Sequence, residues 1–181
     1  MNIRKTSLPA MSALNHTFNF SDYTDSYFTE LNLNGNEIEL EELVTVIFMC
    51  SPPWAARLLD VRNKIAGVFG LKRYELPARD MQKNISQENA EQYGVFKVFF
   101  KNRHELIMGT NDRHLNFRVS LLVHNSPEKE IKEISISTVV KFNNTVGRFY
   151  FFFVKPIHRR IVPALLKGIA GYYEIKTGNT T

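Results

Sequence analysis

Apolar and polar residues alternate with a period of two through much of the second half of the chain, which predicts β-strands. The plainest case is residues 113–124, where every second residue is apolar. The same alternation, or a short apolar run bounded by turn residues, occurs in further segments. Strands are therefore predicted over Tyr23–Leu33, Val95–Lys101, Glu105–Gly109, Arg113–His124, Ile131–Phe142 and Arg148–Val154.

Helical spacing of apolar residues occurs on both sides of this run of strands. Acidic residues followed by Leu40, Leu43, Val44 and Ile47 predict a first helix over about residues 37–47. A second helix is expected from Ser51 to Gly70, and residues 71–92 read as a long polar loop. The second helix rests on one apolar stripe, made of Trp54, Leu58, Val61, Ile65 and Phe69.

The last helix is predicted to begin at Pro156, because proline is tolerated in the first turn of a helix. Its expected buried side comprises Ile157, Ile161, Val162, Leu165, Leu166 and Ile169. Together the elements predict an α+β fold with a curved antiparallel sheet of about six strands. Two short helices would follow the first strand, and a long C-terminal helix would pack over the sheet. This is the helix-grip arrangement, and it often encloses a cavity. One domain is expected over residues 1–181, with 1–7 and 174–181 frayed.

Composition fits one globular domain of 181 residues, since 44% of them are hydrophobic and 12% aromatic. Cys50 is the only cysteine, which excludes a disulfide framework. No apolar run approaches the roughly 20 residues of a membrane span. Arg4 and Lys5 are followed by no apolar segment, so no signal peptide is expected. We therefore expect a cytoplasmic protein without a transmembrane segment.

The net charge of +5 is unevenly placed. Residues 1–140 carry 16 Lys and Arg against 17 Asp and Glu, whereas residues 141–181 carry seven against Glu174 alone. This basic segment is either a solvated face or a surface for an anionic ligand, phosphate or membrane. A nucleic-acid partner is not expected, because the chain has no arginine-rich tract and no zinc-finger spacing.

Three stretches carry a resemblance to a known family: Pro52–Arg62, Asp112–Ser120 and Gly147–Arg159. Together they resemble the bacterial family called domain of unknown function 2867, over about residues 8–172. That family is similar to the START/Bet v 1-like (helix-grip, SRPBCC) superfamily. The resemblance implies a helix-grip fold, and it brings no established catalytic residue to this chain.

A cavity between the sheet and the last helix is the first candidate site. The same side chains would either line an open pocket or fill an ordinary core. The candidates are Phe99, Met108, Phe117, Thr138, Tyr150, Phe151, Phe153, Ile161 and Leu165.

His158 and Arg159 are the candidates for binding an anionic head group. They would stand at the start of the last helix, where backbone N–H groups and the macrodipole also favour anions. Plain solvation of these side chains is the alternative, with His158 a packed, hydrogen-bonded residue.

A polar cluster precedes and enters the strand over residues 113–124. By alternation its side chains project to the outer, convex face of the sheet, away from any cavity. Asp112 is then a turn residue and Arg118 an ion-pair or hydrogen-bond anchor, with a partner-binding surface or catalysis as alternatives. The cluster comprises Asp112, Arg113, His114, Asn116 and Arg118.

No motif indicates a metal, a cofactor or a catalytic nucleophile. The five histidines lack i,i+4 pairing, and no glycine-rich phosphate loop is present. The leading hypothesis is therefore a protein that binds a small apolar or amphipathic molecule. The alternatives are a cyclase, dehydratase or isomerase using Thr138, Tyr150 or His158, and a protein-interaction module, with a homodimer possible.

Overall fold

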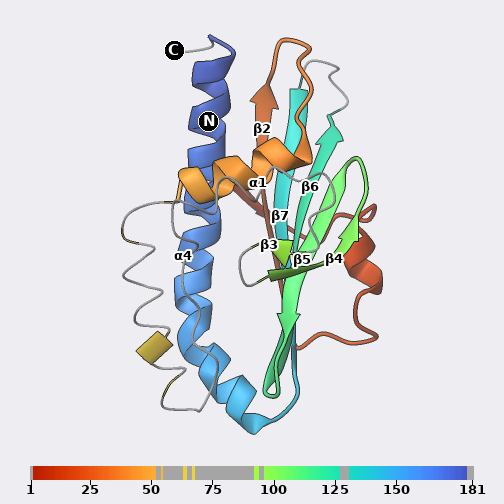
Figure 1. Cartoon of the computed structure of the whole chain (residues 1–181), viewed down its shortest axis with the longest axis vertical. Coiled ribbons are helices and arrows are strands. Elements are labelled where there is room, and N and C mark those ends of the chain that lie inside the picture. Colours follow the sequence, from red (N-terminus) through yellow and green to blue (C-terminus); the bar gives the residue numbers. More distant parts are fainter. Residues whose placement is uncertain are drawn as a thin grey trace.

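One antiparallel sheet dominates the computed structural model, which describes residues 2–51, 54, 63, 64, 67, 92, 93, 96–126 and 131–178. Among these residues the sheet has seven strands in the order β1-β2-β7-β6-β5-β4-β3 (Figure 1). The strands are β1 (Arg4–Thr6), β2 (Tyr23–Asn32), β3 (Gln92–Tyr93), β4 (Phe96–Lys101), β5 (Glu105–Asn111), β6 (Leu115–Asn125) and β7 (Ile131–Phe142).

The predicted α+β class is confirmed, and so are five of the predicted strands, within a few residues at their ends. The strand count is seven rather than the expected six, because β1 and β3 were not predicted and the strand expected over residues 148–154 is helical. Strands β1 and β3 are short edge strands, of three and two residues, and a pattern that brief carries no period.

The predicted strand over residues 148–154 is wrong. The chain there is the beginning of α4 (Thr145–Lys176), one helix of 32 residues that runs along the sheet (Figure 1). Asn144 caps it, since its side chain accepts a hydrogen bond from the Gly147 N–H. The expected start at Pro156 is wrong for the same reason, because Pro156 lies inside the helix.

The start of α4 requires a glycine at position 147. The helix lies so close to the turn before β6 that a Cβ on Gly147 would stand 2.0 Å from the His114 carbonyl oxygen. Asn143 and Asn144 fix this approach through the bonds Asn143 Nδ2 to Asp112 O, 2.7 Å, and Asn144 Nδ2 to Arg113 O, 3.2 Å. The turn before β6 therefore anchors the helix that covers the sheet.

The helix predicted around residues 37–47 is confirmed as α1 (Leu40–Met49). It crosses the sheet near α4 in Figure 1 and buries Leu40, Leu43, Val44 and Val46 in the main core. Of the expected second helix, residues 54, 63, 64 and 67 are helical. The rest of that helix and residues 71–91 lie outside the described residues, as does most of the stretch Pro52–Arg62.

The N-terminal segment covers the outer face of the sheet. It contains the short 3-10 helix η1 (Ala13–His16), and β1 pairs with β2. Beneath η1 lies Glu105, which is only 2% exposed. Its carboxylate accepts bonds from Ser12 Oγ at 2.5 Å, Ser120 Oγ at 2.5 Å and the Ala13 N–H at 2.8 Å.

Length alone does not make α4 a membrane element. None of the helices in the described ranges combines enough length with enough apolar character to cross a membrane.

Candidate functional site

An apolar cavity of about 350 Å³ lies between the inner face of the sheet and the helices α1 and α4. The strands supply its floor because alternation sends one set of side chains toward α4. These include Met108 of β5, Phe117, Val119 and Leu121 of β6, and Ile136 and Val140 of β7. Helix α4 forms the opposite wall, which includes Tyr150, Phe151, Val154, Ile161 and Leu165.

The structure brings most of the residues named as cavity candidates to this one hollow, where His158 also lies. The lining includes Met108, Phe117, Thr138, Tyr150, Phe151, Ile161 and Leu165.

Phe99 and Phe153 lie elsewhere, which corrects their expected placement. Phe99 sits where the register between β4 and β5 shifts, and its ring centre is 3.3 Å from Cζ of Arg118. Phe153 follows a helical period of about 100° per residue rather than the alternation of a strand. It turns away from the sheet and packs edge-on against Phe149 and Phe152.

A chain of three polar side chains borders the cavity. Asp25 of β2 has a side chain only 1% exposed, and its Oδ1 is 3.2 Å from Nε2 of His158 on α4. The Tyr23 hydroxyl donates to Asp25 Oδ2 at 2.5 Å. His158 lines the cavity, so this chain fixes an imidazole at its wall.

The surroundings of Asp25 favour its ionised form. Burial alone would raise its pKa, but the hydrogen bond and charge of His158, the Tyr23 hydroxyl and the charge of Lys5 together hold it below its usual range. Burial, with the Asp25 carboxylate, raises the pKa of Tyr23, so the phenol keeps its proton and donates. The pair Asp25–His158 therefore combines a buried carboxylate with an oriented ring.

His158 and Arg159 do not stand at the beginning of a helix, and the argument from the helix N-terminus is therefore wrong. Both lie near the middle of α4. Arg159 is outside the cavity lining, and its Nε donates to the Tyr23 hydroxyl at 3.4 Å. Lys155 Nζ lies 5.1 Å from the Tyr23 ring centre, so two cations border Tyr23.

The predicted polar cluster belongs to the anchor of α4 and to the outer face, except that Asp112 also lines the cavity, which corrects its expected placement away from it. His114 Nδ1 is 3.2 Å from Asn144 Oδ1, and Asn116 Nδ2 is 3.3 Å from Asn143 Oδ1. Asp112 Oδ1 accepts from the His114 N–H at 3.2 Å. These contacts hold the turn between β5 and β6 against the turn between β7 and α4. Arg113 takes part through its backbone carbonyl.

Arg118 is a hydrogen-bond anchor of the outer face and is only 5% exposed. It donates to the carbonyls of Phe117 and Thr110, at 2.8 and 3.2 Å, and to Asn111 Oδ1 at 2.8 Å. Burial lowers the pKa of this guanidinium to about 10. Phe99 covers its plane. Arg118 is therefore engaged by its own sheet.

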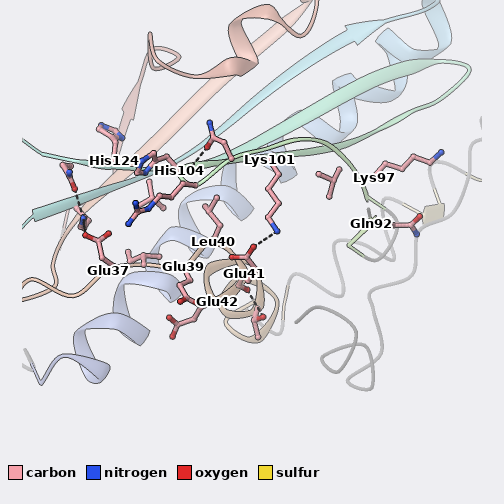
Figure 2. A pocket seen from close by; sticks show the side chains of 18 residues that line it. Glu37, Glu39, Leu40, Glu41, Glu42, Gln92, Lys97, Lys101, His104 and His124 are labelled. Carbon is pink, nitrogen blue, oxygen red and sulfur yellow. Dashed lines mark hydrogen bonds and ion pairs between the residues drawn. The ribbon is translucent and has the colours of Figure 1, made fainter. Parts of the chain in front are cut away.

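A second and larger hollow, of about 1710 Å³, lies between α1 and the strand ends and is lined mainly by charged side chains (Figure 2). Its main charges pair with each other: Lys101 with Glu41 at 2.5 Å, and Lys132 with Glu37 at 2.9 Å. Lys132 also donates to Asn125 Oδ1 at 2.7 Å. Because these cations already have partners, the smaller cavity is the better candidate site.

A family model described as protein of unknown function (DUF2867) matches residues 18–165. The chain belongs to this family. No curated protein matches the chain. A crystal structure of a conserved protein from Geobacillus kaustophilus is 12% identical and covers 83% of this chain and 95% of that one, with a TM-score of 0.37. That score is too low to infer a shared fold.

Sequence reasoning missed Asp25 in this DUF2867 protein, although a signal was present. Tyr27, Leu31 and Leu33 mark the buried face of the first long strand, and a period of two places Asp25 on that face. An acid on an apolar face needs a partner, and His158 is that partner. Within the described residues, no three His, Cys, Asp or Glu side chains gather as a metal site requires.

Proposed function

We propose that this member of the DUF2867 family binds a small apolar or amphipathic molecule between the inner face of the sheet and α4. The observation that carries the proposal is the apolar cavity of about 350 Å³. Pockets for small molecules are typically about 300–1,000 Å³ and mostly apolar, with a few polar groups. Burial of apolar ligand surface supplies roughly 25 cal/mol per Å², from which the cost of association is subtracted.

The arrangement of α4 supports a second part of the proposal, that the protein is a helix-grip protein. A long C-terminal helix lies along an antiparallel sheet, with a cavity between them. This is the arrangement expected of a helix-grip protein similar to the START/Bet v 1-like superfamily. In such a protein the binding site would be the cavity itself rather than a surface loop.

Titration with the neutral dye Nile red tests the binding proposal. Val119 lines the cavity floor, so Val119→Phe fills part of the space. Val146 of α4 lies outside the lining and is 36% exposed, so Val146→Phe adds the same atoms elsewhere. We expect the wild type and Val146→Phe to bind the dye equally, and Val119→Phe to bind at least about tenfold more weakly, which corresponds to about 1.4 kcal/mol.

A second filling variant, Val154→Phe, enters the cavity from α4 instead of the sheet. It should reduce dye binding in the same way while circular dichroism confirms an unchanged fold. Equal binding by the wild type and both filling variants would contradict the proposal, as would no binding by the wild type. Native mass spectrometry of protein purified from its host, before and after denaturation, would then identify a bound molecule.

Proton transfer to or from the bound molecule is the second candidate function. The observation that favours it is the pair Asp25–His158, in which a buried carboxylate orients an imidazole at the cavity wall. Decanone in heavy water provides a test, because a base beside the cavity would speed exchange of its α-protons, seen by NMR. The exchange should disappear in His158→Gln. If the α-protons of decanone exchange at the uncatalysed rate in the presence of the wild type, this second function is wrong and passive binding remains.

A further inference from the structure

Thr138 is a polar residue on the wall of the apolar cavity, and its hydroxyl has no partner among the described residues. It lies in the middle of β7, is 2% exposed and lines the cavity. Among the described residues, no group forms a hydrogen bond with its Oγ1. A buried hydroxyl without a partner costs about 1–3 kcal/mol, and such groups are rare in native structures. A bound molecule that supplies the missing bond would recover this cost.

Thr138 lies beside the polar chain of the cavity wall. In the sheet register its direct partner on β2 is Asp25, and Asp25 bonds His158 of α4. Side chains that are direct partners across antiparallel strands have Cβ atoms about 5 Å apart. One end of the cavity therefore combines the Thr138 hydroxyl with the His158 ring.

The hydrogen bond to Asp25 defines what His158 presents to a ligand. An ionised carboxylate only accepts, so Nε2 of His158 carries the proton of this bond. Nε2 is thus engaged by Asp25, and Nδ1 has no other partner in the part of the chain that the structure describes. The cavity end thus offers the Thr138 Oγ1–H as a donor and, beside it, Nδ1 of the His158 ring as a second polar atom.

The charge of Asp25 restricts the ligand further. Its carboxylate is buried and stands next to Thr138, so a carboxylate or phosphate bonded to Thr138 would meet a like charge in a poorly solvated place. The cations Lys155 and Arg159 lie by Tyr23 and outside the cavity lining. A neutral group that both accepts and donates avoids this repulsion, and a hydroxyl does both.

We propose that the cavity holds a neutral amphiphile with a hydroxyl group, an apolar alcohol or phenol, whose oxygen accepts from Thr138 and lies beside the His158 ring. This inference rests on the proposed function, because it names the class of molecule that the same cavity binds. The apolar body of the molecule lies against the sheet floor and α4, and the hydroxyl replaces the hydrogen bond that Thr138 lacks.

Calorimetric titration of the whole protein with decanol, decanoate and chlorodecane tests the inference. The three probes share one alkyl chain and differ only in the terminal group. We expect decanol to bind most tightly. Thr138→Val should weaken decanol about three- to tenfold, the worth of one neutral hydrogen bond, and leave chlorodecane unchanged. Thr138→Ser keeps the hydroxyl and should restore decanol binding.

Thr29→Val is the matched control. Thr29 of β2 is also fully buried and its Oγ1 also lacks a partner among the described residues, but it does not line the cavity. This variant should bind all three probes as the wild type does. An equal loss of decanol affinity in Thr29→Val would mean that the effect is structural, and the inference would be wrong.

The outcomes separate this inference from the proposed function. If chlorodecane binds as tightly as decanol, or if Thr138→Val leaves decanol unchanged, the hydroxyl class is wrong while apolar binding stands. If decanoate binds most tightly, the site takes an anion and the argument from Asp25 fails. If neither Nile red nor any of the three probes binds the wild type, the proposed function fails and this inference with it.

Discussion

Two buried polar regions on opposite faces of the central sheet differ in how their hydrogen bonds are satisfied. On the outer face the protein supplies partners for Glu105, which accepts three hydrogen bonds, and for Ser137, whose Oγ is 2.7 Å from that of Ser26. On the inner face the hydroxyl of the next residue, Thr138, has no partner within the described part of the chain. At Glu105 and Ser137 the chain itself supplies the hydrogen bonds, whereas at the cavity wall the Thr138 hydroxyl leaves one hydrogen bond for a molecule from outside.

Glu105→Ala should have the largest effect, because Glu105 is the buried acceptor of three hydrogen bonds on the outer face. The substitution leaves Ser12, Ser120 and the Ala13 N–H without their acceptor beneath η1. We expect the free energy of unfolding to fall by about 3 kcal/mol or more. Urea denaturation measures this change. Glu30→Ala is the control, since Glu30 is an exposed residue of the same sheet, and a similar loss there would contradict the assignment.

Gly147→Ala should have the next largest effect, because it disturbs the cover of the inner face. The new Cβ would stand 2.0 Å from the His114 carbonyl oxygen, so the start of α4 must move. We expect a loss of about 1–3 kcal/mol in unfolding free energy and weaker binding of Nile red. Gly171→Ala is the control, because nothing lies within 4 Å of its added Cβ. An unchanged Gly147→Ala variant would contradict the close approach.

Ser137→Ala and Thr138→Val sharpen the comparison at two adjacent positions of β7. Ser137→Ala removes a buried hydrogen bond to Ser26 and should cost about 1 kcal/mol. Thr138→Val removes a hydroxyl that bonds none of the described residues, so the unliganded protein should keep or slightly gain stability. Thermal unfolding of both variants without ligand measures the difference. A larger loss in Thr138→Val than in Ser137→Ala would show that the hydroxyl is paired.

We expect the smallest effect from Asp25, which contributes to the pH dependence of the free energy of unfolding. Its folded pKa lies below the unfolded value of about 3.9, so its stabilising contribution is complete above that value. The contribution is lost as the pH falls through the lower folded pKa. In Asp25→Asn, unfolding free energy should therefore depend less on pH in the acid range than in the wild type. Identical slopes would contradict the role given to the His158 contact.

The alternation of β6 shows how much of the candidate site the sequence predicts. Leu115, Phe117 and Val119 share one face with the cavity, and Arg118 lies on the other, as a period of two requires. This prediction depends only on neighbouring residues in one strand. It therefore needed no knowledge of what covers either face.

The segment from Arg148 to Val154 shows where such reasoning fails. Its apolar residues fit a central strand as well as a helix, since a short apolar run has no decisive period. The Asn144 cap is local, but the bond from Asn144 to the Arg113 carbonyl and the contact of Gly147 with His114 select the helix as well, and these two join residues about 30 positions apart. Pro156 also led to a wrong predicted start of the last helix, because proline is typical of a helix start but here lies inside α4.

By itself the sequence determined the α+β class, five long strands, their inner and outer faces, and the helix at α1, because each depends on local periodicity. The tertiary structure alone decided that α4 begins at Thr145, that Asp25 meets His158, and that no described residue bonds the Thr138 hydroxyl. These depend on which distant side chains the sheet register and the helix anchor bring together. A hydrogen bond or its absence is a property of two positions in space, and no single stretch of sequence contains both.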